Sequence, residues 1–283
     1  MRRLVHLSDL HFGRDRPELV KPLTDLVNHL APDLVVISGD LTQRARRSQF
    51  HKARAFIDAL DPEVLVVPGN HDVPLYNLFR RFLTPWRRYR RWIEQDLQPV
   101  FVDDEILVVG LNTVDPLSVQ RGRVRSRALA RVQNVFLKHA QDRIRIIAAH
   151  HPLEHAPDQQ KQIMRGADSA MAHFIEAGAD MILTGHLHTW RAEPFAEQSD
   201  VTATLQIHAG TSLSTRTRGE ENDFNLIEID GDTITVTRYA ASPTAKLFSS
   251  SDVRRFKARS GWSGASSREK MAEPQGKRAG HLS

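Results

Sequence analysis

Residues 4–11 read Leu-Val-His-Leu-Ser-Asp-Leu-His, and this stretch decides the fold. A short, mostly apolar run ends in a turn that carries a carboxylate and an imidazole. Continuous apolar runs of this length are typical of strands that are covered on both faces. The pattern recurs along the chain, and we expect strands at each recurrence. They span Leu4–Leu7, Leu34–Ser38, Val64–Val67, Ile106–Gly110, Ile144–Ala149 and Met181–Leu183.

Helical stretches lie between these strands, which predicts an α/β fold. Examples are Glu18–Leu30, Ser48–Leu60, Ser126–His139 and Ser169–Ala177. After residue 200 the pattern becomes β-rich. Strands are expected over Val201–His208, Asn225–Ile229 and Thr233–Tyr239. The Asp230-Gly231-Asp232 turn between the last two is typical of a β-hairpin.

Residues 74–97 are interpreted as an inserted pair of helices within the domain. Thr84 can cap the second helix, and an apolar stripe follows it. The stripe consists of Trp86, Tyr89, Ile93 and Leu97, and six arginines surround it. Two interpretations stay open. The insert is either a wall of the site whose arginines meet phosphate, or an amphipathic helix with a solvated basic face.

The chain has 283 residues and a formal charge of +5. Residues 251–283 contain eight basic and three acidic residues, so they account for the whole excess. We therefore expect one domain over residues 1–248, followed by a disordered basic tail over residues 249–283. The neutral remainder lacks the electrostatic footprint of a duplex-binding protein, so nucleic acid is not an expected partner.

Several features of the sequence predict where in the cell the protein is found. The absence of an apolar run of eighteen residues predicts no membrane partner. The N-terminal residues lead directly into the first strand without the apolar core and cleavage site of a signal peptide, which predicts a cytoplasmic protein. The chain has no cysteine, which excludes disulfides and thiolate metal sites.

Five of the expected strands end in turns that carry metal-ligand residue types. These turns are Ser8–His11, Ser38–Asp40, Pro68–Asp72, Ala149–Pro152 and Thr184–His188. Ligands of open α/β sheets bind beyond the carboxyl ends of the strands. Carboxylates, imidazoles and amide oxygens suit Mn²⁺, Fe²⁺, Zn²⁺ or Co²⁺, and a carboxylate can bridge two ions. One such motif alone is weak evidence, but five in order predict a site for two metals. His6, within the first strand, is interpreted as structural.

These turns resemble the signature of the calcineurin-like metallophosphoesterases. The matching residues are Asp9-x-His11, Gly39-Asp40, Gly69-Asn70-His71-Asp72, His150 and Gly185-His186-x-His188. The resemblance covers residues 4–188 in the expected order. It implies a four-layer α/β/β/α sandwich of two mixed sheets, with a dimetal site at the carboxyl ends of the strands.

The resemblance also implies a role for each residue. Seven would hold two divalent ions: Asp9, His11 and His188 the first, Asn70, His150 and His186 the second, and Asp40 both. His71 would protonate the departing oxygen, and Asp72 would orient His71. His150 is preferred to His151 as the ligand because it comes first off the strand.

Departures from other branches narrow the expected function. The Asp-Arg-Gly element of protein Ser/Thr phosphatases does not follow Asp40, and Gln43 stands where purple acid phosphatases carry a tyrosine. The remaining resemblance is to class III cyclic-nucleotide phosphodiesterases. It implies that two ions, Mn²⁺ or Fe²⁺ first and Zn²⁺ or Co²⁺ next, activate water against a small phosphodiester. The first candidate is 3′,5′-cyclic AMP. The alternatives are a nuclease, a glycerophosphodiester or nucleotide-sugar hydrolase, and a non-catalytic scaffold. The oligomeric state stays open.

Overall fold

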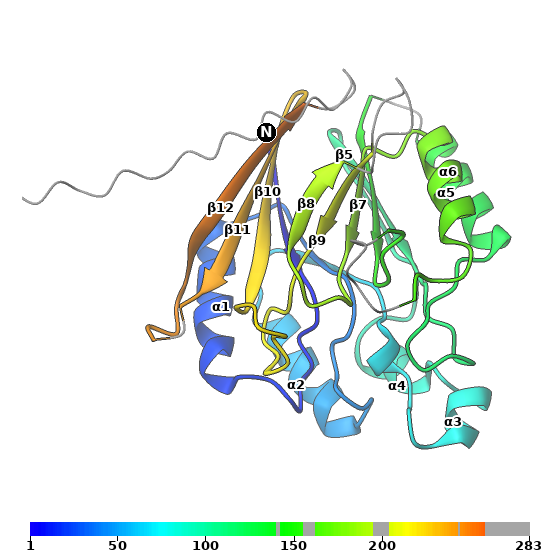
Figure 1. Ribbon diagram of the computed structural model, residues 1–283, viewed down its shortest axis with the longest axis vertical. Helices are drawn as coiled ribbons and strands as arrows, with labels where there is room; N and C mark the ends of the chain where they lie inside the picture. Colours follow the sequence, from blue (N-terminus) through cyan, green and yellow to red (C-terminus); the bar gives the residue numbers. More distant parts are fainter. Residues whose placement is uncertain (140–141, 155–161, 195–203, 243, 258–283) are drawn as a thin grey trace, which may run out of the picture.

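Two six-stranded sheets pack face to face, and helices cover their outer faces (Figure 1). This computed structural model describes residues 1–139, 142–154, 162–194, 204–242 and 244–257. Both sheets combine parallel and antiparallel strands. The predicted four-layer α/β/β/α sandwich is therefore confirmed.

The first sheet begins with three parallel strands and two connecting helices. They are β1 (Arg2–Leu7), α1 (Pro17–Leu30), β2 (Leu34–Ile37), α2 (Arg47–Asp58) and β3 (Glu63–Val66). Pro17 opens α1, where its missing N–H costs no hydrogen bond. Leu19, Leu23 and Val27 recur at helical spacing and bury one face of α1 against the sheet.

Both faces of these strands are buried, which explains their continuous apolar sequence. Leu4 and Val36 face the second sheet and belong to the core between the two sheets. Val5 and Val35 point the opposite way and pack under α1 and α2. A strand with one solvated face would alternate apolar and polar residues instead.

Three antiparallel strands complete the first sheet, whose order is β12-β11-β10-β1-β2-β3. They are β10 (Asp223–Asp230), β11 (Thr233–Ala241) and β12 (Phe248–Lys257). The hairpin predicted at Asp230-Gly231-Asp232 joins the first two.

The strand β12 corrects the predicted start of the tail at residue 249. It pairs with β11 from Phe248 opposite Ala241 to Lys257 opposite Thr233. Phe248 and Phe256 are buried, whereas the polar and charged residues between them are exposed or half-buried on this edge strand. Because these residues are polar, the sequence lacks the apolar run that predicts a strand. The rest of the expected tail, residues 258–283, lies outside the described residues.

The second sheet has the order β4-β5-β6-β7-β9-β8, with its four central strands parallel. Its strands are β4 (Val100–Val102), β5 (Ile106–Leu111), β6 (Ile144–Ala149), β7 (Met181–Thr184), β8 (Arg191–Pro194) and β9 (Leu205–His208). Its helices are α5 (Ser126–Lys138) and α6 (Ala167–Glu176). The edge strands β4 and β8 are not predicted from the sequence, because they are short and only partly buried.

The insert over residues 74–97 forms two short helices, α3 (Leu78–Leu83) and α4 (Arg87–Trp92). Tyr89 is buried, and Ile93 and Leu97 pack against the core under α1 and α2. The buried side of α4 is therefore apolar. Among the described residues, no helix has the length and apolar character that crossing a bilayer requires.

Candidate metal centre

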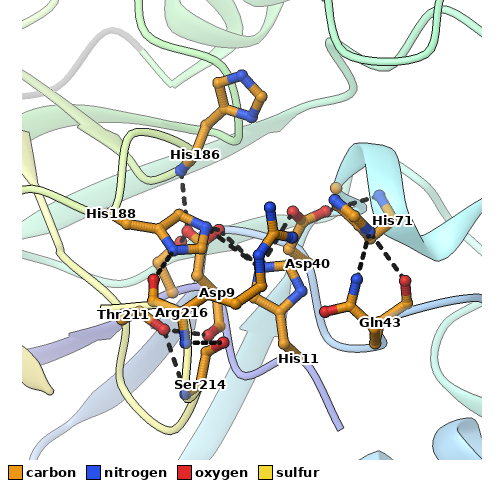
Figure 2. Close-up of polar contacts among 12 residues, drawn as sticks. Asp9, His11, Asp40, Gln43, His71, His186, His188, Thr211, Ser214 and Arg216 are labelled. Carbon is orange, nitrogen blue, oxygen red and sulfur yellow. Dashed lines mark hydrogen bonds and ion pairs between the residues drawn. The ribbon is translucent and has the colours of Figure 1, made fainter. Parts of the chain in front are cut away.

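The loops after five parallel strands meet at one end of the sandwich. Three follow β1, β2 and β3 of the first sheet, and two follow β6 and β7 of the second. All seven predicted ligands lie in these loops, and each is at most 7% exposed. They are Asp9, His11, Asp40, Asn70, His150, His186 and His188. Figure 2 shows the side chains of Asp9, His11, Asp40 and His188 converging.

Two glycines allow the loops to approach this closely. A Cβ atom on Gly69 would lie 2.1 Å from the backbone nitrogen of Asp40. A Cβ atom on Gly185 would lie 1.8 Å from Ser8 Oγ. No side chain fits at either distance, so only glycine permits these contacts. Because Gly185 belongs to the second sheet and Ser8 to the first, the second contact joins the sheets.

The first group of donor atoms surrounds Asp9 Oδ1. His188 Nε2 lies 3.0 Å and His11 Nε2 3.3 Å from this oxygen, and the two nitrogens are 3.3 Å apart. Atoms that ligate one ion at about 2.1 Å lie roughly 3.0–3.4 Å from each other. Asp9 Oδ1 is buried and accepts no hydrogen bond among the described residues. The group therefore fits a cation.

The other oxygen of Asp9 is held by the protein. Asp9 Oδ2 accepts hydrogen bonds from the hydroxyl of Ser8 at 2.6 Å and from the backbone N–H of His186 at 2.8 Å. These two donors fix the carboxylate plane. One oxygen is thus anchored while its neighbour faces the histidines.

The second group of donor atoms surrounds His150 Nε2. Asn70 Oδ1 lies 3.1 Å and His186 Nδ1 3.2 Å from this nitrogen. Asp40 Oδ2 lies 3.4 Å from His150 Nε2 and 3.6 Å from His11 Nε2 of the first group. One carboxylate oxygen therefore borders both groups, in the position that a bridging ligand requires.

Backbone carbonyls fix the tautomers of two histidines. His150 Nδ1 donates a hydrogen bond to the carbonyl of Ser38 at 2.8 Å, and His188 Nδ1 donates to that of Arg216 at 2.6 Å. The proton on Nδ1 leaves Nε2 as the metal-binding nitrogen, an arrangement typical of metal-bound histidine.

His151 is differently placed. Its Nε2 donates to the carbonyl of Gln120 at 3.0 Å, and its Nδ1 accepts from the hydroxyl of Thr113 at 2.8 Å. Both ring nitrogens already have protein partners, which favours His150 as the ligand.

The backbone of the site is strained. Nine non-glycine residues of the described chain have positive φ, and five of them are predicted ligands. These five are Asp9, His11, Asp40, His186 and His188. The left-handed region costs an ordinary residue about 1–2 kcal/mol. Strain of this kind persists where the surrounding structure enforces it, and it concentrates at functional sites.

The carboxylates and imidazoles of the site balance each other electrostatically. Burial alone would raise the pKa of Asp40, but the charges of His150 and His71 hold it well below its usual range. Burial also opposes the ionisation of Asp9, yet His188 keeps its pKa low. Burial lowers the pKa of His150, but Asp40 outweighs it and raises the value to about 9. Both carboxylates are therefore ionised, as metal ligands must be.

His71 stands beside the two groups. Its Nδ1 donates to the carbonyl of Gln43 at 2.8 Å, and its backbone N–H donates to Asp40 Oδ1 at 2.8 Å. Its ring packs edge-on against that of His11, with 4.9 Å between the centroids. Nε2 of His71 has no hydrogen-bond partner among the described residues, and this half-buried ring borders a cavity.

The contacts of Asp72 differ from the prediction that it orients His71. Its Oδ1 accepts from the backbone N–H and the hydroxyl of Thr42, at 2.9 and 3.1 Å, and its Oδ2 accepts from the N–H of Gly69 at 2.9 Å. Burial, together with the charge of Asp40, raises the pKa of Asp72 to about 7. The carboxyl group braces two ligand-bearing loops, and in the described chain it makes no hydrogen bond to the ring of His71.

Three contacts at the site were missed by sequence reasoning. Ser8 and Gln43 adjoin predicted motifs, but their hydrogen bonds to Asp9 and His71 leave no mark on the sequence pattern. Thr211 donates to the carbonyl of Asp9 at 2.7 Å from a position 202 residues away. Sequence motifs relate residues that are close along the chain, so they could not predict a contact over this separation.

A sequence model of the calcineurin-like phosphoesterase family matches residues 2–190, which is more than half of the chain. The match spans all five ligand-bearing loops. The chain belongs to the calcineurin-like phosphoesterase family. As a calcineurin-like phosphoesterase, it is a metal-dependent phosphoester hydrolase.

Curated relatives of this calcineurin-like phosphoesterase include phosphodiesterases. The cAMP/cGMP dual specificity phosphodiesterase MT0825 of Mycobacterium tuberculosis is 27% identical over 82% of this chain and 77% of its own. A probable glycerophosphodiester phosphodiesterase GpdQ of Arcobacter nitrofigilis is 27% identical over 57% of this chain and 63% of its own. GpdQ of Enterobacter lignolyticus is 35% identical, over 24% of this chain and 29% of its own. The chain thus spans less than two thirds of either GpdQ.

Solved structures with the same fold include two phosphatases. Purple acid phosphatase PPD1 from yellow lupin has a TM-score of 0.64 at 13% identity, covering 90% of this chain and 53% of its own. A dimetal phosphatase from Danio rerio has a TM-score of 0.62 at 13% identity, covering 88% of this chain and 98% of its own. At such identity the likeness concerns the fold alone.

Proposed function

We propose that this calcineurin-like phosphoesterase hydrolyses phosphodiester bonds in small substrates at a site for two divalent ions. The observation that carries the proposal is the position of Asp40 Oδ2, 3.4 Å from His150 Nε2 and 3.6 Å from His11 Nε2. A carboxylate shared by two donor groups holds two ions close enough to act on one phosphoryl group. When bound, the ions would activate water and neutralise charge on that group.

Each ion has its own ligands in this proposal. Asp9, His11 and His188 hold the first, Asn70, His150 and His186 hold the second, and Asp40 holds both. Four imidazoles favour Mn²⁺ or Fe²⁺ over hard Mg²⁺, which prefers oxygen ligands and water. Zn²⁺ and Co²⁺ also suit this donor set.

His71 acts as the general acid. Because its Nδ1–H is held by the carbonyl of Gln43, proton transfer to the departing oxygen runs through Nε2. The bond from its backbone N–H to Asp40 Oδ1 keeps the residue beside the proposed bridging ligand. Asp72 contributes indirectly by bracing the loops that carry Asp40 and Asn70.

The cavity beside His71 fits an anionic substrate of moderate size. Its volume is about 560 Å³, and no carboxylate lines its described part. Four arginines line it: Arg14, Arg44, Arg46 and Arg216. Guanidinium groups bind phosphate oxygens in pairs, which favours substrates that present phosphate.

Two substrate classes lead. A cyclic nucleotide is favoured by the match to MT0825, which extends over most of both chains. A glycerophosphodiester is favoured by the cavity itself, because its described lining contains no phenylalanine, tyrosine or tryptophan on which a nucleobase would stack. The match to GpdQ supports the second class over a shorter span.

The test is a substrate panel with Mn²⁺-loaded protein. The panel contains 3′,5′-cyclic AMP, glycerophosphocholine, a UDP-sugar, single-stranded DNA and bis(p-nitrophenyl) phosphate. We expect turnover of the small diesters, with loss on chelation and recovery on adding Mn²⁺. The ratio of kcat/KM values decides between the two classes. Preference for DNA, or full activity after metal stripping, would contradict the proposal. Asp40→Asn, of nearly the same shape, is the inactive control.

A further inference from the structure

The short helix α3 buries a charged residue and exposes its apolar residues, which is the reverse of an ordinary surface helix. Its buried residue is Arg81, which is 3% exposed, whereas Phe79 is 76% and Leu83 62% exposed. A surface helix normally buries its apolar residues and presents its charges to solvent. The inversion leaves the apolar residues of α3 uncovered. Figure 1 shows the helix at the lower right of the molecule, away from both sheets.

The uncovered surface extends beyond α3 into a neighbouring loop. Large apolar side chains are exposed over residues 76–83 and 117–119, including every exposed phenylalanine, tyrosine or tryptophan of the described chain. They are Tyr76, Leu78, Phe79, Phe82, Leu83, Leu117 and Val119. We call this set the α3 patch. A cluster of exposed apolar side chains marks a contact surface, whereas single ones are normal.

Arg81 joins the two segments of the α3 patch. Its guanidinium donates to the carbonyls of Pro116 at 2.6 Å and Pro74 at 3.1 Å, and also to that of Ser118. A buried guanidinium with three carbonyl acceptors holds one orientation. The outward display of the apolar side chains therefore follows from a specific anchor.

Positive charge surrounds the α3 patch. Between Asp72 and Glu94 the sequence contains six arginines and no acidic residue. A cavity of about 220 Å³ borders α3 at Arg80 and Thr84. Five arginines line it: Arg47, Arg80, Arg87, Arg88 and Arg91. Within the described chain, none of the five is ion-paired, and burial together with the charge of Arg80 lowers the pKa of Arg88.

We propose that the α3 patch and these arginines dock on the surface of an anionic lipid bilayer. The apolar side chains enter the boundary between headgroups and acyl chains, where aromatic rings are favoured, and the guanidinium groups meet lipid phosphates. The expectation of no membrane partner concerned spanning segments, which a surface contact does not need. Val119 of the patch also lines the cavity beside His71, so the docking surface borders the candidate active site.

Charge and shape favour lipid over other occupants. A second copy of this chain would bring together two segments that each carry six arginines and no acid. At 100° per residue, the side chains from Leu78 to Leu83 cover an arc of roughly 140° around the helix. An acidic protein would need a deep groove to cover such an arc, and nucleic acid would leave the leucines exposed. The acyl chains of a lipid bilayer can adapt to the shape of the α3 patch.

The test is cosedimentation of the full chain with vesicles of phosphatidylcholine, alone or with phosphatidylglycerol at a 7:3 ratio. We expect binding to the anionic vesicles only. Phe79→Ser with Phe82→Ser should weaken it at least roughly tenfold, because two apolar anchors are lost. Leu137→Ser is the matched control, since Leu137 is 66% exposed on α5, outside the patch, and it should bind like the wild type. Unchanged hydrolysis of bis(p-nitrophenyl) phosphate will show that each variant is folded.

The charge requirement is tested separately. Arg87→Gln with Arg91→Gln should weaken binding about fivefold for each arginine, whereas Arg255→Gln on β12 should have no effect. Equal binding of neutral vesicles, or equal losses in patch and control variants, would overturn the proposal. So would a wild-type dimer in sedimentation velocity that Phe79→Ser with Phe82→Ser dissociates without any vesicle binding. That result would assign the patch to a second copy. None of the vesicle-binding or sedimentation measurements depends on the proposed substrate.

Discussion

The carboxylate of Asp40 divides its two oxygens between the protein and the site. Oδ1 accepts the backbone N–H of His71, and Oδ2 faces His11 and His150. Asp9 follows the same scheme, with Oδ2 held by the protein and Oδ1 facing histidines. A carboxylate anchored through one oxygen presents the other in a fixed direction, which is how a protein preorganises a metal site.

Substrates with different leaving groups can distinguish proton donation by His71 from a role in metal binding. A ribose alkoxide leaves poorly without a proton, whereas a nitrophenolate leaves readily. Proton donation is typically worth about 10²–10⁴-fold, so His71→Ala should lose far more kcat/KM on cyclic AMP or glycerophosphocholine than on bis(p-nitrophenyl) phosphate. The measurement is kcat/KM on both types of substrate, with the metal content of each sample.

Two outcomes would contradict this assignment. Equal losses on both substrates with two metals retained would mean that His71 positions the phosphate. A lost metal would make it a ligand, which the clustering of His11, Asp40 and His71 permits. Gln43→Ala is the companion variant. It should keep the proton donor, because the backbone carbonyl that accepts from His71 Nδ1 remains.

His6 should make the metal-free protein sensitive to acid. Burial lowers the pKa of His6 to about 3, although the charge of Asp9 opposes this. Below pH 6.5 the unfolded chain therefore binds a proton that the folded chain refuses, and stability falls as the pH falls toward 3. The free energy of unfolding should fall by up to about 1.4 kcal/mol for each unit by which the pH is lowered.

The measurement is urea unfolding in excess chelator at several pH values between 7.5 and 5. His6→Gln keeps a polar side chain near Ser38 and Asn225 but does not titrate, so its stability should fall less steeply than that of the wild type. Parallel curves for the two proteins would show that His6 titrates normally. Other buried histidines contribute equally to both curves.

At the scale of elements, β12 connects the two hydrophobic cores on either face of the first sheet. Phe248 packs in the core under α1 and α2, and Phe256 packs in the core between the sheets. An edge strand with one large side chain in each core contributes to stability from both sides.

Truncation should show this contribution. Removing residues 248–257 together with the remainder deletes two buried phenylalanines, each worth about 3–5 kcal/mol, and should lower Tm strongly. Truncation after Lys257 should leave Tm nearly unchanged. Phe256→Ala should also destabilise, whereas Val253→Ala, at a residue that is 46% exposed, is the matched control. Equal Tm values for the two truncated proteins would show that β12 adds nothing to the fold.

The strands that were predicted from the sequence are mainly those that are buried on both faces. The central strands are buried on both faces and read as apolar runs, so β1, β2, β6 and β7 were found with their ligand-bearing turns. The edge strands β4 and β8 are short and only partly buried, and β12 is polar along most of its length, so these three strands were not predicted. Ligand types at the strand ends were visible. The braces behind them were not, because the partners of Asp72 and His71 are mainly backbone groups, which every residue has.

For the whole molecule, the proposed metal centre is also a clamp between the sheets. Four of the predicted ligands follow strands of the first sheet and three follow strands of the second. Two ions held by ligands from both sheets would link loops that otherwise meet through contacts such as Gly185 against Ser8. Metal binding at these residues would therefore affect the stability of the entire sandwich.

Added Mn²⁺ should raise Tm in proportion to the logarithm of its concentration. An ion at about 100 times its Kd contributes about 2.7 kcal/mol. The measurement is calorimetric unfolding over a range of Mn²⁺ concentrations, against chelator. His150→Ala removes a ligand from the second sheet and should flatten the response. If Tm is the same with Mn²⁺ and with chelator, the sheets are not linked through metal.

The left-handed backbone at five predicted ligands also affects how this sequence can change over generations. Glycine and asparagine adopt that conformation with little strain, whereas β-branched residues do not. Descendants released from selection for catalysis would therefore accumulate glycine and asparagine at positions such as Asp9 and Asp40 first. They would become more stable as the strain is relieved. Selection for the ligands at these positions would thus keep the fold less stable than it could otherwise become.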